Sequence, residues 1–276
     1  MISTITLRSL LMGAGTNYAL IDARGFESPD IDVSKFGFVG KHGAKIVRAL
    51  WRDRKIRLEF ALRSSTPASY ATLRQNLIKA FDLARAGNTD LMFTTLDGKN
   101  LQVNVNLANA MDGGFQPGYI TAGRIRIELI AGDPNLYGQT LNQQDINPPI
   151  AGGVTLPTVI PFALASSGGS ATVANNGNGA SFPIIRIYGP STNGHVRNST
   201  LGVQFNIATT IATGDYVEID LLNQTVLLNG ITNYIQYFTG SWWWLEPGNN
   251  SIQFNSDGNE PASFARLFWR DAYLGI

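Results

Sequence analysis

Apolar and charged residues alternate along residues 55–63, which is the period of a strand with one buried face. Residues 123–130 alternate in the same way. Between them, residues 91–96 and the alternating residues 102–107 flank an Asp-Gly pair, which favours a tight hairpin turn. The first part of the chain is therefore predicted to be a β domain.

One helix is predicted inside this domain. Thr66 suits the N-cap, and Pro67 suits the first helical position because its ring presets the backbone angle. Apolar residues then recur at spacings of three and four, at Tyr70, Leu73, Leu77, Phe81 and Ala84. A Gly-Asn pair at 87–88 is typical of a helix end, so the helix is expected at about 67–86.

The second half of the chain alternates in short runs with no helical period. Residues 201–207 and 217–221 alternate apolar and polar side chains, and 225–228 runs into an Asn-Gly turn. Glycine, proline and asparagine pairs crowd residues 139–180, which is typical of a linker and loops. Short strands between frequent turns favour a β-sandwich.

The pattern thus predicts a mainly β, two-domain protein. The N-terminal unit, a β-sandwich or barrel-like fold with one α-helix, is expected at residues 1–137. A linker with first strands is expected at 138–174, and a C-terminal β-sandwich at 175–276.

Charge supports a division of the chain. The net charge is +1, but residues 1–132 hold 17 Lys and Arg against 11 Asp and Glu. Residues 133–276 hold 4 against 9. Opposite charge on the two halves favours head-to-tail packing between copies. There is no cysteine, which excludes disulfides and thiolate-bound metals, and no apolar run has the length of a membrane span.

Motifs of catalysis are missing from the sequence. The two histidines, His42 and His195, are far apart and lack the spacing of a zinc site. No nucleophile elbow, P-loop or dinucleotide fingerprint occurs. Glu218 and Asp220 share one face of a predicted strand, which favours a solvated surface over a catalytic pair. We expect no enzyme activity, no cofactor and no metal.

A basic stretch with an embedded tryptophan is the first feature that suggests a partner. Its members are Arg48, Trp51, Arg52, Arg54, Lys55 and Arg57. Such a stretch suits nucleic acid, where phosphate contacts dominate affinity, but acidic residues interrupt it. A solvated strand or a charged subunit interface is the favoured interpretation. The interface hypothesis covers the loop 34–45 and Arg52, Arg54, Arg57, Arg124 and Arg126.

The second such feature is the run Trp242, Trp243 and Trp244. In an extended segment Trp242 and Trp244 share one face and Trp243 points the other way. At least one of the three is therefore expected outside the core, as a contact for a protein partner or a glycan. Trp243 is the candidate for this contact.

The second half also carries ordered motifs that identify a family. They are Asn175-x-Gly177, residues 182–190, 198–202, 213–220, 228–230, 245–252 and 268–276. Together they resemble the galectin-like C-terminal domain of the distal tail proteins of long-tailed bacteriophages. The run 133–137, Asp-Pro-Asn-Leu-Tyr, resembles the junction that ends the N-terminal domain in that family.

This resemblance implies a structural role. Such proteins form hexameric rings at the distal end of the tail in the virion, which is assembled in the host cytoplasm. The ring joins the tail tube protein to the tail-tip hub protein and to receptor-binding proteins, and DNA passes through without specific binding. No membrane insertion is implied.

Two alternatives stay open. The first is a carbohydrate-binding adsorption module that recognises host-surface glycan through the tryptophans. Three successive aromatic residues precede the 245–252 turn, where the family usually shows one. True galectins use a His-Asn-Arg set on one strand, and the nearest segment here, 195–198, is expected in a loop. The second alternative is a nucleic-acid-binding protein that uses the basic stretch.

Overall fold

A computed structural model describes residues 2–82, 87–113, 121–149, 169–258 and 260–276. Within it the chain forms two compact units, residues 1–139 with 273–276 and residues 140–272. We call them unit 1 and unit 2. Both consist mainly of β-strands, which confirms the predicted fold class. Residues 83–86 of the expected helix and 150–168 of the expected linker lie outside the described residues.

Unit 1 is built on one large sheet with the strand order β2-β1-β7-β8-β9-β6-β3. Its strands are β1 (Ile2–Leu7), β2 (Leu10–Gly13), β3 (Tyr18–Arg24), β6 (Arg54–Arg63), β7 (Thr89–Thr95), β8 (Asn100–Leu107) and β9 (Ala122–Ala131). The short β10 (Leu136–Gly138) pairs with β8 and with β24 (Ala272–Tyr273).

The alternation read from the sequence decides which face of this sheet is buried. In β6 the four apolar residues Ile56, Leu58, Phe60 and Leu62 are all buried, and the charged residues between them face outward. β9 pairs with β6 along its full length and alternates in the same way. One face of the sheet therefore forms the core of unit 1, and the other is charged.

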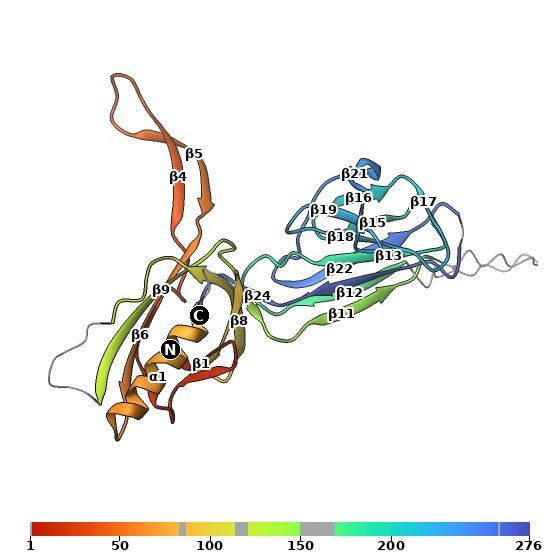
Figure 1. Cartoon of the computed structure of the whole chain (residues 1–276). Coiled ribbons are helices and arrows are strands. Elements are labelled where there is room, and N and C mark those ends of the chain that lie inside the picture. Colours follow the sequence, from red (N-terminus) through yellow and green to blue (C-terminus); the bar gives the residue numbers. More distant parts are fainter. Residues whose placement is uncertain (1, 83–86, 114–120, 150–168, 259) are drawn as a thin grey trace, which may run out of the picture. The chain divides into compact units, whose positions relative to one another are not determined.

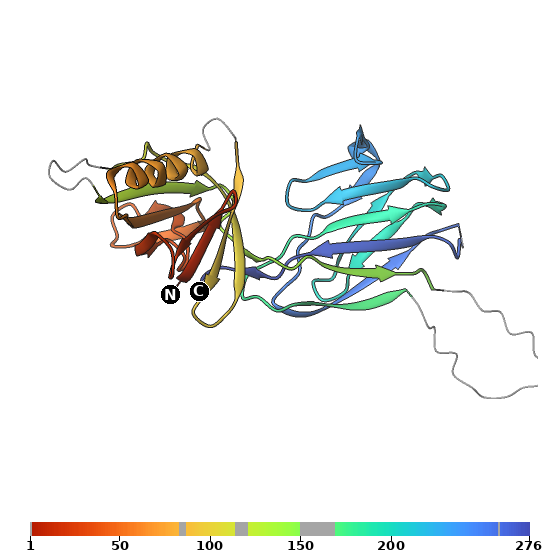
Figure 2. The ribbon, with the colours of Figure 1, turned by 60° about the horizontal axis from the view of Figure 1, so that its bottom comes forward.

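The helix α1 (Pro67–Ala80) of unit 1 lies along the apolar side of the sheet (Figure 2). The hydroxyl of Thr66 accepts a hydrogen bond from the Ser69 N–H at 3.2 Å, so the predicted N-cap is present. The helix ends at Ala80, earlier than the sequence indicated. Phe81 leaves the helical conformation and buries its ring 6.4 Å from that of Phe60. Phe81 fits the helical spacing of apolar residues although it lies beyond the helix, because it is buried in the core from a non-helical position.

A separate two-stranded sheet projects from unit 1 (Figure 1). β4 (Ile31–Gly37) pairs with β5 (Ala44–Trp51) to form a hairpin that continues from the end of the β3–β6 pair. Every residue of both strands is exposed. We refer to residues 31–51 as the hairpin.

Unit 2 contains two main sheets around one apolar core. The first has the order β11-β23-β13-β18-β19-β20, made of β11 (Asn142–Ile146), β13 (Ile184–Tyr188), β18 (Tyr216–Asp220), β19 (Thr225–Leu228), β20 (Thr232–Asn233) and β23 (Phe264–Trp269). The second has the order β12-β22-β15-β16-β21, made of β12 (Ser170–Asn175), β15 (His195–Asn198), β16 (Val203–Ile207), β21 (Phe238–Gly240) and β22 (Gly248–Asn255). Smaller elements are β14 (Ser191–Thr192), β17 (Thr210–Ile211) and the 3-10 helix η1 (Ile235–Tyr237).

One expectation about unit 2 is wrong. Residues 195–198 form strand β15 and are not a loop. They pair on one side with β16 and on the other with β22, so the segment sits inside the second sheet. Pairing with strands that are distant in the sequence organises this short segment. No helix of the described chain has the length and apolar character needed to cross a membrane.

Candidate interaction surfaces

Arg54, a predicted interface residue, is instead a buried connector within unit 1. Only 1% of it is exposed. Its guanidinium donates hydrogen bonds to the carbonyl oxygens of Pro134 and Gly25, each at 2.7 Å, and to that of Glu27. A further bond reaches the Leu274 carbonyl at 2.7 Å, 220 residues away. The interface hypothesis is wrong for Arg54, because backbone groups of its own chain occupy its donors.

The environment of Arg54 explains why a charge is tolerated there. Burial lowers its pKa to about 10, with Glu27 and Asp133 acting in the opposite direction. The group therefore stays a cation at neutral pH, and the four carbonyls replace the water that it loses. Arg54 thereby ties the turn before the hairpin to the C-terminal residues of unit 1.

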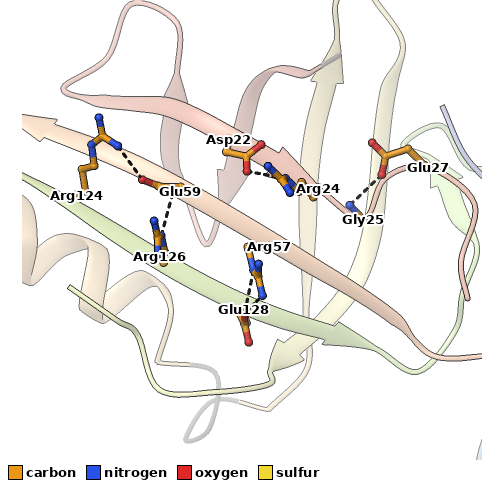
Figure 3. A network of polar contacts seen from close by, with 9 residues as sticks. All are labelled: Asp22, Arg24, Gly25, Glu27, Arg57, Glu59, Arg124, Arg126 and Glu128. Carbon is orange, nitrogen blue, oxygen red and sulfur yellow. Dashed lines mark hydrogen bonds and ion pairs between the residues drawn. The ribbon is translucent and has the colours of Figure 1, made fainter. Parts of the chain in front are cut away.

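The outer face of the β3–β6–β9 sheet carries a network of ion pairs (Figure 3). Glu59 of β6 accepts from Arg126 at 2.9 Å and from Arg124 at 3.4 Å. Arg57 donates to Glu128 at 2.6 Å, directly across the β6–β9 pair.

The charges in this network stabilise one another. Hydrogen bonds from Asn109 and Arg57 lower the pKa of Glu128, and the hydrogen bond to Glu59 raises the pKa of Arg126. Arg57, Arg124 and Arg126 thus each have a carboxylate neighbour in their own chain. Two carboxylates therefore balance part of the charge of these three arginines.

Arg52 differs from the other arginines. Its side chain is exposed at the foot of the hairpin, and its backbone N–H donates to the Asp30 carbonyl at 2.8 Å. The five predicted interface arginines are therefore one buried connector, three members of the charged face and one exposed residue. For Arg52, Arg57, Arg124 and Arg126 the interface role stays a prediction.

The hairpin has the most apolar exposed surface of unit 1. Its large apolar side chains point into solvent at Ile31, Val33, Phe36, Ile46, Val47, Leu50 and Trp51, and Phe38 and Val39 continue them at the tip. Phe36 is 72% exposed. Lys35, Lys41, Lys45 and Arg48 make the same segment basic. Sequence reasoning placed an interface in the loop 34–45 but missed the apolar strands on either side of it.

A groove of about 470 Å³ lies beside β3. We call it the β3 groove; it is lined by Ile2, Leu20, Ile21, Asp22, Ala23, Phe26, Glu27 and Ile276. Six of its eight lining residues are apolar and two are carboxylates, and its surface is polar and apolar in about equal parts. Ile21 is the extra residue of a bulge in β3, since Leu20 pairs with Phe60 and Asp22 with Glu59. The bulge turns an isoleucine outward at the edge of the sheet.

The three tryptophans of unit 2 differ in burial. Trp243 is only 1% exposed and packs against Phe205, with ring centroids 6.1 Å apart. Trp242 stacks on Phe238 at 4.0 Å, while Trp244 is 38% exposed and donates to Glu246 at 2.8 Å. Trp243 as the contact residue is therefore wrong, because its ring lies in the core. Trp244 is the exposed member, and its role as a contact stays a prediction.

The outer face of the second sheet of unit 2 is polar. His195 and Arg197 of β15 lie opposite Asn206 and Gln204 of β16. A shallow cavity of about 340 Å³ opens here, lined by Asn193, His195, Gln204, Asn206, Ala208, Thr239 and Asp257. Within the described ranges, no group of three His, Cys, Asp or Glu side chains is placed to hold a metal ion.

Comparison with known proteins agrees with this architecture. Residues 176–273 match the family model described as the Siphovirus-type tail component, C-terminal domain. The crystal structure of SPP1 Dit (gp 19.1) is similar with a TM-score of 0.65 and 14% identity, over 96% of this chain and 97% of that one. A chain of the phage p2 baseplate in its activated conformation with Sr is similar with a TM-score of 0.48 and 12% identity, over 97% of each chain.

No curated protein sequence matches the chain. The predicted resemblance to distal tail proteins with a galectin-like C-terminal domain is confirmed by the family model and by the shared fold.

Proposed function

We propose that this chain is a structural subunit of a phage tail tip, in which a hexameric ring of copies joins the tail tube to the host-adsorption apparatus. The observation that carries the proposal is the likeness of 96% of the chain to SPP1 Dit. That protein is described as a paradigm of the hub adsorption apparatus in phages that infect Gram-positive bacteria.

The hairpin supports a role in assembly. A monomeric protein rarely exposes a large continuous apolar surface, and such surfaces usually mark contacts with other proteins. Full burial of a side chain such as Phe36 or Ile46 contributes about 1.5–3 kcal/mol. The hairpin exposes several such side chains, so burying them against another subunit would stabilise an assembly.

The ion-paired face supports passage of DNA without tight binding. Affinity for DNA depends mainly on cations that neutralise phosphates. Glu59 and Glu128 hold three arginines of this face in ion pairs, so the arginines are less available to DNA. A conduit needs such weak binding, since a tightly held genome would stall.

The proposed partners follow from the same role. They are further copies of this chain, the tail tube protein, the tail-tip hub protein and receptor-binding proteins. The proposed location is the distal end of the virion tail, with assembly in the cytoplasm of the host.

Light scattering of the purified full chain, followed by negative-stain imaging, tests the ring. We expect six-fold rings or stacked pairs of rings, with the tail tube protein added if the chain alone stays monomeric. A chain that remains monomeric even with the tail tube protein would contradict the proposal.

The conduit part has its own test, which is DNA binding measured by fluorescence anisotropy at several salt concentrations. The wild type should bind weakly and lose binding at about 150 mM salt. Glu59→Gln combined with Glu128→Gln should bind more tightly, with a steeper salt dependence, because three arginines become available. Asp97→Asn, far from this face in the sequence, is the control. Tight wild-type binding at physiological salt would favour the nucleic-acid-binding alternative.

A second candidate function, recognition of host-surface glycan, rests on the polar face of unit 2. β15 aligns His195 and Arg197 beside Asn206 and Gln204, an arrangement rich in hydrogen-bond donors and acceptors. A glycan array with the full chain is the test, with His195→Ala and Arg197→Ala as variants and Trp244→Ala as the comparison. Binding that only the first two variants abolish would assign the site, and an empty array would exclude it.

A further inference from the structure

The hairpin lacks an apolar partner within the described part of its own chain. All residues of β4 and β5 are exposed, and the tip residue Val39 is fully so. Arg54 holds the turn at its base through the carbonyls of Gly25 and Glu27. Each strand of about seven residues carries the tip roughly 23 Å from that base. The hairpin is thus a projection with an anchored base, which positions its apolar residues to meet another molecule.

The β3 groove of the same unit has the complementary character. Ile2, Ile21 and Ile276 supply apolar walls over the buried ring of Phe26, which packs edge-on to Phe93 at 4.8 Å. The groove holds two carboxylates, Glu27 and Asp22, of which Asp22 is paired with Arg24 at 2.8 Å, whereas the hairpin is basic.

Both walls of the groove are held in place. Ile276 donates its backbone N–H to the Phe26 carbonyl at 3.1 Å. Arg54 binds the Glu27 and Leu274 carbonyls at the same time. A preformed groove loses little entropy when it is filled. Glu27 uses one carboxylate oxygen to accept the Gly25 N–H at 3.1 Å (Figure 3).

The same chain cannot fill its own groove with this hairpin. The groove residues Phe26 and Glu27 lie four or five residues before β4, at the anchored base, and the hairpin extends away from that base (Figure 1). A projection and a groove that match but cannot meet within one molecule make a head-to-tail contact between copies. Such a contact generates a closed ring when the rotation between copies closes.

We infer that the hairpin of one copy seats in the β3 groove of the next, with its apolar tip on Ile21 and Ile276 and its lysines near Asp22 and Glu27. This inference rests on the proposed ring, because it names the contact that would close the ring. The occupant is a second copy of this chain. Rings that form without this contact, which would leave the groove to a different protein, are the outcome that overturns the inference.

Engineered cysteines test the contact directly, since the chain has none of its own. The full chain carries Val39→Cys in the hairpin together with Ile21→Cys in the groove. The control carries Val39→Cys with Ile78→Cys on α1, because Ile78 and Ile21 are equally exposed at 45% and 44%. A disulfide forms only where the Cα atoms approach within about 7 Å. Mild oxidation and non-reducing electrophoresis then report which pair meets.

We expect the Ile21 pair to give a ladder of covalent oligomers that ends at the hexamer, and each single-cysteine variant to give dimers at most. The Ile78 pair should give no ladder. Rings seen by light scattering without a ladder, or with equal ladders from both pairs, overturn the inference and leave the proposed function standing. A monomeric wild type, even with the tail tube protein, overturns both.

A charge exchange gives a second measurement that does not depend on disulfides. Glu27→Lys should weaken assembly several-fold by placing like charges together, and Glu27→Lys with Lys35→Glu should restore part of it. Circular dichroism confirms that each variant is folded. Loss of assembly in both variants to the same extent would exclude the ion pairs from the contact.

Discussion

Two β-hairpins of unit 1 use similar residues and end in opposite environments. The β7–β8 hairpin buries Leu91, Phe93, Val103 and Val105 in the core. The β4–β5 hairpin buries none of its apolar side chains. The difference lies in the neighbours: β7 and β8 pair with β1 and β9, whereas β4 and β5 pair only with each other. An apolar strand thus becomes part of the core where the rest of its own unit packs on it, and stays an exposed surface where nothing in the described chain does.

Removing one aromatic ring from each hairpin should separate these two environments. We expect Phe93→Ala to lower the free energy of unfolding by about 3–5 kcal/mol, because it leaves a cavity in a packed core. Phe36→Ala should change it by less than about 0.5 kcal/mol, because the ring is already in water, while it weakens assembly. Urea unfolding and light scattering measure the two effects. Equal destabilisation by both variants would refute the contrast.

Arg54 and Arg52 are two positions apart and differ in the same way, since Arg54 is buried and Arg52 is exposed. Arg54→Met should cost about 3 kcal/mol of unfolding free energy, because the carbonyls that it satisfies become unpaired inside unit 1. Arg52→Met should be close to neutral in stability. Urea denaturation of the two variants at pH 7 is the measurement. A stable Arg54→Met protein would mean that Arg54 does not hold the base of the hairpin.

Trp243 and Trp244 sharpen the comparison in unit 2. Trp243→Phe should lower the free energy of unfolding by about 1–2 kcal/mol, because lost packing is partly offset by removal of a buried indole N–H that has no hydrogen-bond partner among the described residues. Trp244→Phe should stay within about 0.5 kcal/mol of the wild type. Thermal unfolding followed by near-UV circular dichroism compares them. A larger loss for Trp244→Phe would reverse the assignment of the core side.

The smallest expected effect concerns the ion pair of Asp145 with Arg266, joined at 2.6 Å. The hydrogen bond from Arg266 lowers the pKa of Asp145, so its contribution is present above the ordinary carboxyl pKa of about 3.9. It is lost as the pH falls through the lowered folded-state pKa. Asp145→Asn should therefore cost less than about 1 kcal/mol at pH 7 and nothing near pH 2. Urea unfolding of both proteins across this range measures it; a cost that persists at pH 2 would indicate a steric cause.

Local features were predictable because their causes are local. Alternation over residues 55–63 anticipated β6, and Thr66 with Pro67 marked the start of α1. The ordered motifs of the second half identified the family that residues 176–273 match. The helix end and β15 were mistaken because both depend on distant partners, the core around Phe81 and the flanking strands β16 and β22.

The candidate sites were only partly predictable. Arg54 and Arg52 belong to the same basic stretch, and nothing in the stretch distinguishes a buried connector from an exposed residue. The β3 groove joins Ile2, Ile21 and Ile276, which are near the two ends of the chain, so no sequence window contains it.

By itself the sequence determined the strands, the turns, the start of the helix and the family resemblance, since these follow from side-chain periodicity, backbone preference and ordered motifs. Only the tertiary structure decided which apolar residues are covered, which tryptophan faces the core and which arginine is buried. Burial is set by contacts between segments far apart in the chain, such as Arg54 with Leu274, and a local pattern carries no record of them.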